Sequence, residues 1–199
     1  MEKNKFEILK ELLKKDRSYR RFDEEYQIDR NILLKLVDLT RYCASGRNMQ
    51  PLKYYITNEN EICDQIFQLL KWAGYLTEWD GPEKGERPTA YLIQCLDTTL
   101  TKNYLCDDGI QLQAITLGAV SEGLGCCIIK SFNVEKLKEV VGLFNNLEPL
   151  YVVAIGKPIE KVELENLESR NKDDIKYYRT PDGIHHVPKR VLEDLIINN

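Results

Sequence analysis

Segments with a helical spacing of apolar residues alternate with short apolar runs along most of this sequence, and this alternation constrains the fold most. Apolar residues three and four positions apart predict amphipathic helices, whereas short apolar runs between turn residues predict buried strands. The predicted helices cover residues 3–15, a segment that begins at the N-cap Asp29 and carries Ile32–Leu39, and residues 59–71, 104–122 and 134–141. The predicted strands are Tyr54–Thr57, Tyr91–Leu96, Cys126–Ile129 and Leu150–Ile155. Such alternation indicates one layered sheet domain of α/β type.

The longest predicted helix, residues 104–122, is expected to turn one set of apolar or small positions inward. These positions are Ile110, Ala114, Leu117, Gly118 and Ser121. Gly123 and Gly125 follow, either as a helix stop or as glycines that let the backbone approach a ligand closely.

The sequence after the last predicted strand departs from this pattern. Residues 159–199 are charged and show weak periodicity until Val191. About 40 residues without core periodicity are long for a loop in a compact domain. We therefore expect this tail to wrap a partner subunit.

Composition narrows the class of protein. The chain has 199 residues, 43% of them hydrophobic, and a formal charge of −4, so it has the size of one globular domain and is no general nucleic-acid or membrane-surface binder. No apolar run is long enough to cross a bilayer. The six cysteines lack C-x-x-C spacing and lie in apolar stretches, which indicates reduced thiols and a cytoplasmic protein. With two histidines only, a His-rich metal site is not expected.

Two polar segments are candidate binding sites. Arg17-Ser18-Tyr19-Arg20-Arg21-Phe22 places three guanidinium groups and a hydroxyl within a short turn, which suits an anion such as phosphate; the alternative is a solvated basic turn. Ser45-Gly46-Arg47-Asn48-Met49-Gln50-Pro51 offers hydroxyl, amide and guanidinium groups to a heteroaromatic edge or a phosphate; the alternative is a plain surface loop.

Taken in order, these segments resemble the FMN-dependent nitroreductase family. The family's early R-x-S-x-R type motif is matched by Arg17, Ser18 and Arg20, and its S-x-x-N-x-Q-P loop by Ser45, Asn48, Gln50 and Pro51. Its D-x-G-x-x-x-Q helix with an E-G-L-G stop, its G-x-P strand end and its late basic pair are matched by Asp107, Gly109, Gln113, Glu122–Gly125, Gly156, Pro158, Lys189 and Arg190. The resemblance covers about residues 5–196.

The resemblance implies a three-layer α+β domain over residues 1–199, with a mostly antiparallel central sheet flanked by helices. It also implies a homodimer with two FMN molecules at the interface, in which residues 159–199 form an arm that reaches the partner. We expect no nucleic-acid partner and no membrane partner.

The resemblance also assigns residues to FMN. Arg17, Ser18 and Arg20 would hold the phosphate and the pyrimidine side of the flavin, and Lys189 and Arg190 would close on the phosphate. Ser45 and Asn48 would come from the partner subunit, and Gln50 would shape their loop. The backbone of Ile129, Lys130 and Ser131 would run alongside the isoalloxazine ring.

Three features depart from the family pattern. Asp16 stands where many members have arginine, which removes one positive charge from the phosphate site. Leu52 stands where members often have an aromatic residue. The excursion over residues 73–89 is short, so the lid over the substrate pocket is reduced.

The implied activity is that of an FMN-dependent NAD(P)H oxidoreductase. Hydride would pass to flavin N5 and then, by ping-pong kinetics, to a nitroaromatic, a quinone or a similar acceptor, without a catalytic side chain or a metal. The alternatives are a dehalogenase or flavin-destructase reaction on the same scaffold, and a protein that binds or stores FMN without turnover.

Other notable residues have structural explanations. His185 and His186 are expected in a strand or turn, and Cys126 and Cys127 on opposite faces of a strand. Trp72, Tyr75 and Trp79 either line a substrate opening or pack beneath the excursion.

Overall fold

A computed structural model describes residues 4–167 and 171–198, and its centre is a five-stranded sheet. The strands are β1 (Phe22–Asp23), β2 (Leu52–Thr57), β3 (Ala90–Asp97), β4 (Gly125–Ile129) and β5 (Leu147–Pro158). β5 pairs with β3, β4 and β1, and β2 pairs with β3, in each case antiparallel. The α+β class with an antiparallel sheet is therefore confirmed. The α/β interpretation from alternation alone is not, because β3 and β4, which α4 connects, are not neighbours and each pair antiparallel with β5 between them.

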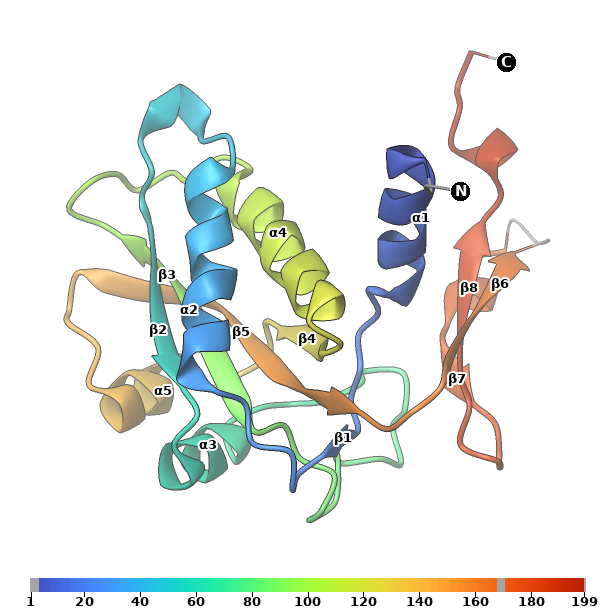
Figure 1. Cartoon of the computed structure of the whole chain (residues 1–199), viewed down its shortest axis with the longest axis horizontal. Helices are drawn as coiled ribbons and strands as arrows, with labels where there is room; N and C mark the ends of the chain where they lie inside the picture. The colour runs from blue at the N-terminus through green and yellow to red at the C-terminus, as the bar shows by residue number, and fades with distance from the viewer. Residues whose placement is uncertain (1–3, 168–170, 199) are drawn as a thin grey trace.

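Helices cover both faces of this sheet (Figure 1). On one face, α2 (Arg30–Leu39) and α4 (Asp107–Ser121) bury Leu33, Leu36, Leu112 and Ile115 against Leu92 and Val153. On the other face, α3 (Asn60–Phe67) and α5 (Val134–Val141) bury Ile66 and Leu137 against Ile93 and Val152. Neighbouring strand residues thus serve opposite cores, and Cys126 and Cys127 do so as expected.

Local signals place several helix ends. Asp29 caps α2 by accepting a hydrogen bond from the amide of Asn31, as its sequence position predicts. Gly142 ends α5 in the left-handed conformation, with φ 63°. α3 ends at Phe67, four residues before the predicted end at Lys71, and the chain continues as a turn.

The buried face of α4 differs from the prediction. Its buried residues are Asp107, Gln111, Leu112, Ile115, Thr116 and Ala119, whereas Ile110 and Ser121 are exposed. The reason is that polar side chains with hydrogen-bond partners occupy inward positions, and a search for apolar periodicity passes over them. Gly118 remains a close contact, since a Cβ there would lie 2.4 Å from Leu39 of α2.

The tail contains more regular structure than its sequence predicts. β6 (Val162–Leu167) pairs in parallel with β8 (His185–Arg190), and β7 (Tyr178–Arg179) pairs antiparallel with β8. The expectation of an unpatterned tail is therefore wrong. β6 does alternate apolar and acidic residues, but its partner β8 is polar and 18 residues further along the chain. His185 and His186 open β8, in agreement with a strand position.

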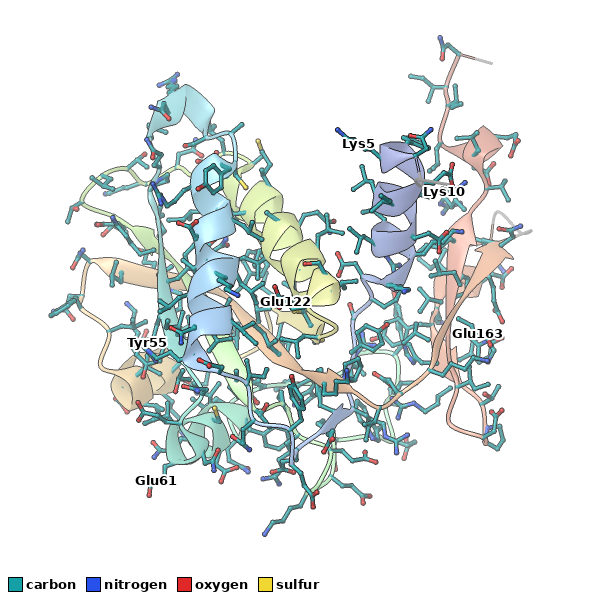
Figure 2. The ribbon with its side chains drawn as sticks, viewed as in Figure 1. Lys5, Lys10, Tyr55, Glu61, Glu122 and Glu163 are labelled. Atoms are coloured by element: carbon teal, nitrogen blue, oxygen red, sulfur yellow. The ribbon has the colours of Figure 1, made fainter. Side chains whose placement is uncertain are left out.

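α1 (Lys5–Lys15) stands between α4 and the tail sheet in Figure 1. It contains no buried residue, and Phe6, Ile8, Leu9 and Leu13 are exposed. Figure 2 shows Lys5 and Lys10 projecting from α1 and Glu122 at the end of α4, where the chain turns into β4. None of the helices in the described part of the chain is long and apolar enough to cross a membrane.

Candidate functional site

A polar cavity of about 200 Å³ lies where the segment after α1 passes between α4 and β4. Its lining residues are Asp16, Arg17, Ser18, Gln113, Thr116, Cys126 and Ile128. Backbone pairing fixes the segment, since Ser18 bridges to Cys126 of β4 and the amide of Tyr19 donates to the carbonyl oxygen of Cys126 at 2.9 Å. The first of the two predicted polar segments therefore forms part of a cavity.

Two glycines after α4 serve this packing. Gly123 ends the helix with φ 74°, and a Cβ on Gly125 would lie 2.5 Å from the ring of Tyr19. Of the two explanations that the sequence leaves open, the helix stop applies to Gly123, and close packing of the Tyr19 ring applies to Gly125.

Arg17 brings uncompensated positive charge to the cavity. Its Nη2 donates to the carbonyl oxygen of Leu13 at 2.9 Å, and its Nε is buried without a hydrogen-bond partner. Among the side chains that the structure describes, no acidic group forms an ion pair with it. A buried guanidinium nitrogen without a partner is costly, and an anion with several oxygens would satisfy it.

Lys189 of β8 adds a second cation. Burial and the nearby charge of Arg17 both lower the pKa of the Lys189 ammonium below its usual value. Two cations that repel each other in this way favour an anion between them.

Arg190, the second member of the predicted basic pair, faces away from Lys189. Successive strand residues alternate in direction, and Arg190 lines a different cavity with Glu193, Asp194 and Ile196. Arg17 and Ser18 thus line the cavity, Lys189 lies outside its lining but within the electrostatic range of Arg17, and Arg190 lines a different cavity.

Asp16 lies in the cavity and is held by α4. Its Oδ2 accepts hydrogen bonds from Gln113 Nε2 at 2.5 Å and from Thr116 Oγ1 at 2.7 Å. Asp16, which stands where many family members have arginine, therefore places a carboxylate within the cavity. This carboxylate holds the side-chain amide of Gln113 through a bond from the amide nitrogen.

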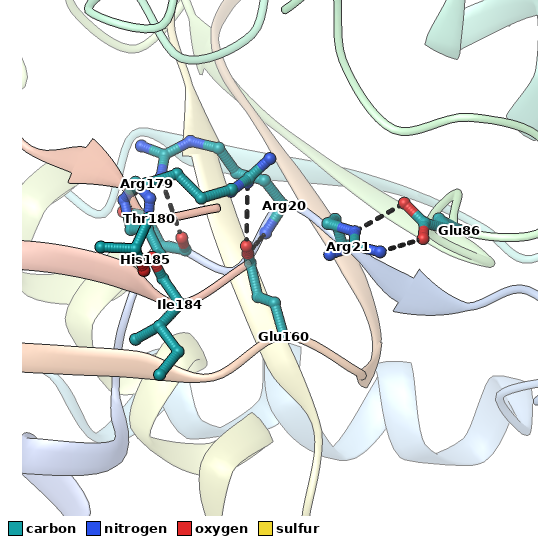
Figure 3. A network of polar contacts seen from close by, with 9 residues as sticks. Arg20, Arg21, Glu86, Glu160, Arg179, Thr180, Ile184 and His185 are labelled. Atoms are coloured by element: carbon teal, nitrogen blue, oxygen red, sulfur yellow. Dashed lines mark hydrogen bonds and ion pairs between the residues drawn. The ribbon is translucent and has the colours of Figure 1, made fainter. Parts of the chain in front are cut away.

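Arg20 does not line this cavity. It is 8% exposed, and its Nη1 lies 3.2 Å from the carbonyl oxygen of Ser18 and 3.1 Å from Nε2 of His185 (Figure 3). Its guanidinium group also lies over the ring of Tyr177, 4.8 Å from the ring centre. The side chain joins the segment after α1 to the tail.

The loop over residues 45–51 is anchored to the first residue of α4. Ser45 Oγ donates to Asp107 Oδ2 at 2.6 Å, and the amide of Gly46 donates to Asp107 Oδ1 at 2.8 Å. Gln50 Nε2 donates to Asn48 Oδ1 at 3.1 Å. In Figure 1 this loop is the cyan turn at the top, on the other side of α4 from α1.

The loop also concentrates backbone strain. Arg47, Asn48 and Gln50 have φ values of 53°, 55° and 49°, which are uncommon for residues with a side chain. Strain of this kind gathers at binding sites. Within one chain, Ser45, Asn48 and Gln50 form a group separate from Arg17, Ser18 and Lys189.

The end of β4 contributes through Ile128 rather than through the next side chain. Ile128 is 41% exposed and lines the cavity, whereas Ile129 is buried in the core beneath α3 and α5. Lys130 Nζ lies 3.4 Å from the hydroxyl of Tyr151, and the carbonyl oxygen of Ser131 accepts from the amide of Lys71 at 2.9 Å.

Four residues of the cavity lining are absent from the sequence-based site, namely Gln113, Thr116, Cys126 and Ile128. Gln113 was noted as part of a motif but not assigned to the site, and Thr116 was not noted. The signal was present, because residues three apart share one face of a helix and Gln113 is three positions before Thr116.

The aromatic residues of the excursion both pack and line a cavity, since Tyr75 and Trp79 border an open cavity of about 390 Å³ together with Arg179. Trp72 and Trp79 contact the core beneath α3 and α5. Tyr75 is half-exposed, and its ring contacts that of Tyr177 in the tail at an angle of 56°, with ring centres 4.9 Å apart. A larger cavity of about 920 Å³ between α2 and α4 contains none of the predicted site residues.

Comparisons with known proteins agree with this fold. The sequence matches the profile of the Nitroreductase family over residues 13–86 and 105–157, which is more than half of the chain. A nitroreductase family protein from Clostridium difficile 630 is similar in structure, with 20% identity, a TM-score of 0.63, and 95% of this chain and 96% of that chain covered.

Two further structures show the same architecture. The nitroreductase family protein of Streptococcus pneumoniae TIGR4 has 18% identity and a TM-score of 0.66, over 83% of this chain and 96% of that chain. The NADPH:FMN oxidoreductase of Vibrio harveyi, solved with NAD+, has 21% identity and a TM-score of 0.62, over 83% of this chain and 80% of that chain. From its sequence match and its architecture, this chain belongs to the nitroreductase family.

Proposed function

We propose that this protein is an FMN-dependent NAD(P)H oxidoreductase that reduces a nitroaromatic, a quinone or a similar small acceptor. The observation that carries the proposal is the cavity beside Arg17, where a buried guanidinium nitrogen lacks a partner and a second cation, Lys189, lies nearby. Family membership and the Vibrio harveyi relative support a flavin as the ligand.

The chain's own groups fit the phosphate of FMN. Arg17 and Lys189 would neutralise its charge, and the hydroxyl of Ser18 lies in the same cavity. The carboxylate of Asp16 tempers this positive field and accepts a hydrogen bond from the amide nitrogen of Gln113. Arg20, which is buried beneath, would support the site without binding the phosphate.

No thiolate competes for the chemistry at this cavity. Burial raises the pKa of the Cys126 thiol well above its usual value, so this thiol stays protonated at neutral pH. When bound, FMN supplies the hydride chemistry, accepting from NAD(P)H and donating to the second substrate. The protein's part would be to bind and orient the cofactor through Arg17, Ser18 and Lys189.

We further propose a homodimer whose two sites each use residues of both chains. The support is the separation of Ser45 and Asn48 from Arg17 within one chain, together with exposed apolar residues on α1 and at the end of the tail. The latter are Phe6, Ile8, Leu9, Leu13, Leu192, Leu195, Ile196 and Ile197. The six free cysteines support a cytoplasmic location.

Titration of apo protein with FMN tests this proposal. We expect the wild-type chain to bind FMN, and Arg17→Ala to weaken binding by about 1.5–3 kcal/mol through loss of a charge-assisted contact. Riboflavin, which lacks the phosphate, should bind both proteins alike.

Arg20→Ala is the contrasting variant. It removes the side-chain bonds to the carbonyl oxygen of Ser18 and to His185 and the contact with the Tyr177 ring, so a lower melting temperature should accompany any loss of FMN affinity. A wild-type chain that binds no FMN, or an Arg17→Ala variant with unchanged FMN affinity, would contradict the proposed site.

A further inference from the structure

A buried group of polar side chains joins the tail to the segment that carries Arg17. We call Arg20, Glu160, Arg179 and His185 the tail junction (Figure 3). Arg20 is 8% and His185 1% exposed, and the side chain of Glu160 is fully buried. These residues come from distant parts of the chain. Arg20 is 140 positions from Glu160 and 165 positions from His185.

Each member of the tail junction contacts another through a directional bond. The carboxylate of Glu160 accepts from the backbone amide of Arg20 and, at 3.1 Å, from Nη2 of Arg179. Arg20 Nη1 donates to Nε2 of His185 at 3.1 Å. The ring of Tyr177 packs on this group, with its centre 5.1 Å from that of His185.

The tail junction determines where Lys189 lies. His185 is the first residue of β8, and Lys189 follows four positions later, about 13 Å along an extended strand. An even spacing places both side chains on the same face, so the face that contacts Arg20 through His185 also presents Lys189. Arg17 precedes Arg20 by three residues. Arg17 and Lys189 are therefore each a few residues along the chain from the buried contact between Arg20 and His185.

A one-residue slip of β8 would move Lys189 to the opposite face, where Arg190 now lies. The tilted ring contact between Tyr75 and Tyr177 is less directional than the hydrogen bond from Arg20 to His185. Buried polar contacts are suited to fixing register in this way.

We propose that Glu160 and His185 are positioning residues, which hold β8 in the register that brings Lys189 beside Arg17 and thereby set the affinity for the phosphate of FMN. Neither residue lines the cavity beside Arg17. The inference rests on the proposed function, and it adds residues that act on the cofactor through the tail.

The test compares FMN with riboflavin as ligands of the full-length apo protein. We expect His185→Phe and Glu160→Gln each to raise the Kd for FMN about tenfold, the effect of losing one charge-assisted contact, and to leave the Kd for riboflavin unchanged. Wild-type affinity for riboflavin shows that a variant is folded, and Glu160→Gln, which keeps the size and an acceptor oxygen, is the milder change. His185→Gln, which keeps an acceptor for Arg20, should restore most of the FMN affinity.

Glu86→Gln is the matched control. Glu86 holds Arg21, the neighbour of Arg20, through a bond from Nε at 2.7 Å and a second bond from Nη2, and it is not hydrogen-bonded to Glu160 or His185 (Figure 3). This variant loses an ion pair of the same segment and should keep the wild-type Kd for both ligands.

A double-mutant cycle separates positioning from general loosening. If the tail junction acts through Lys189, adding His185→Phe to Lys189→Ala should raise the Kd for FMN no further. Additive effects, equal losses for FMN and riboflavin, or wild-type FMN affinity in Glu160→Gln would each overturn the inference. A wild-type chain that binds neither ligand would instead overturn the proposed function itself.

Discussion

His185 makes the stability of this protein depend on pH. Burial first, and then the charges of Arg20, Arg179 and His186, lower its pKa from 6.5 to about 4, and the carboxylate of Glu160 lies in the same group. The unfolded chain therefore takes up this proton at a higher pH than the folded chain. Stability is fully present above about pH 6.5 and falls between there and about pH 4, by about 3 kcal/mol at most.

Urea unfolding at a series of pH values measures this dependence. His185→Gln has no proton to take up at this position, so its free energy of unfolding should fall less than that of the wild type over the same range. Parallel curves for the two proteins would show that His185 does not remain neutral in the folded state.

At the residue scale, the sequence predicts which residues lie near the candidate site better than it predicts the contacts that each of them makes. Arg17 and Arg20 belong to one motif and look equivalent, yet Arg17 lines the cavity and Arg20 is buried against His185. The difference arises from a contact across 165 positions, which no local pattern contains. Lys189 and Arg190 face opposite sides of β8, and the polar sequence of that strand does not reveal the alternation that separates them.

At the scale of elements, the strained loop over residues 45–51 depends on one carboxylate at the start of α4. Asp107 is 1% exposed and accepts from both Ser45 and Gly46. We expect Asp107→Ala to destabilise the protein by about 2–4 kcal/mol and to increase tryptic cleavage after the exposed Arg47.

Asp108→Ala is the control for that experiment. It removes the same charge from the same helix end, but only the backbone oxygen of Asp108 is used, by Gln94 at 3.3 Å. Equal cleavage rates for the two variants would show that Asp107 does not anchor the loop.

The sequence predicts the bounds of elements whose apolar residues recur at a regular spacing. It does not predict the buried face of an element that turns polar side chains toward the core. The range of α5 agrees with its prediction, because its apolar residues recur at helical spacing and Gly142 ends it. The inward face of α4 was misplaced, because Asp107, Gln111 and Thr116 are buried as hydrogen-bonded polar groups. β8 was missed since it is polar and owes its strand conformation to pairing with β6 and β7.

For the whole molecule, the end of the tail is expected to join two chains. Removing residues 191–199 takes away Leu192, Leu195, Ile196 and Ile197, each able to contribute about 1.5–3 kcal/mol when buried, and keeps Lys189. This truncation should weaken the dimer and leave FMN bound at protein concentrations where the dimer persists.

Removing residues 188–199 also deletes Lys189 and should lower both dimer stability and FMN occupancy. Light scattering and flavin content, measured on the same preparations, separate the two effects. A shorter truncation that leaves the dimer as stable as in the full chain would place the interface elsewhere, and a longer one that retains FMN would contradict the role of Lys189.

The central claim is that the cavity beside Arg17 holds an FMN that NAD(P)H reduces. The most direct measurement is the visible flavin absorbance of the purified, FMN-loaded protein under anaerobic conditions, before and after adding NADH or NADPH. Our account predicts a yellow protein that bleaches within minutes and regains its colour when a quinone or nitroaromatic acceptor is added. A yellow protein that neither nicotinamide bleaches would contradict the oxidoreductase and indicate a protein that binds or stores flavin.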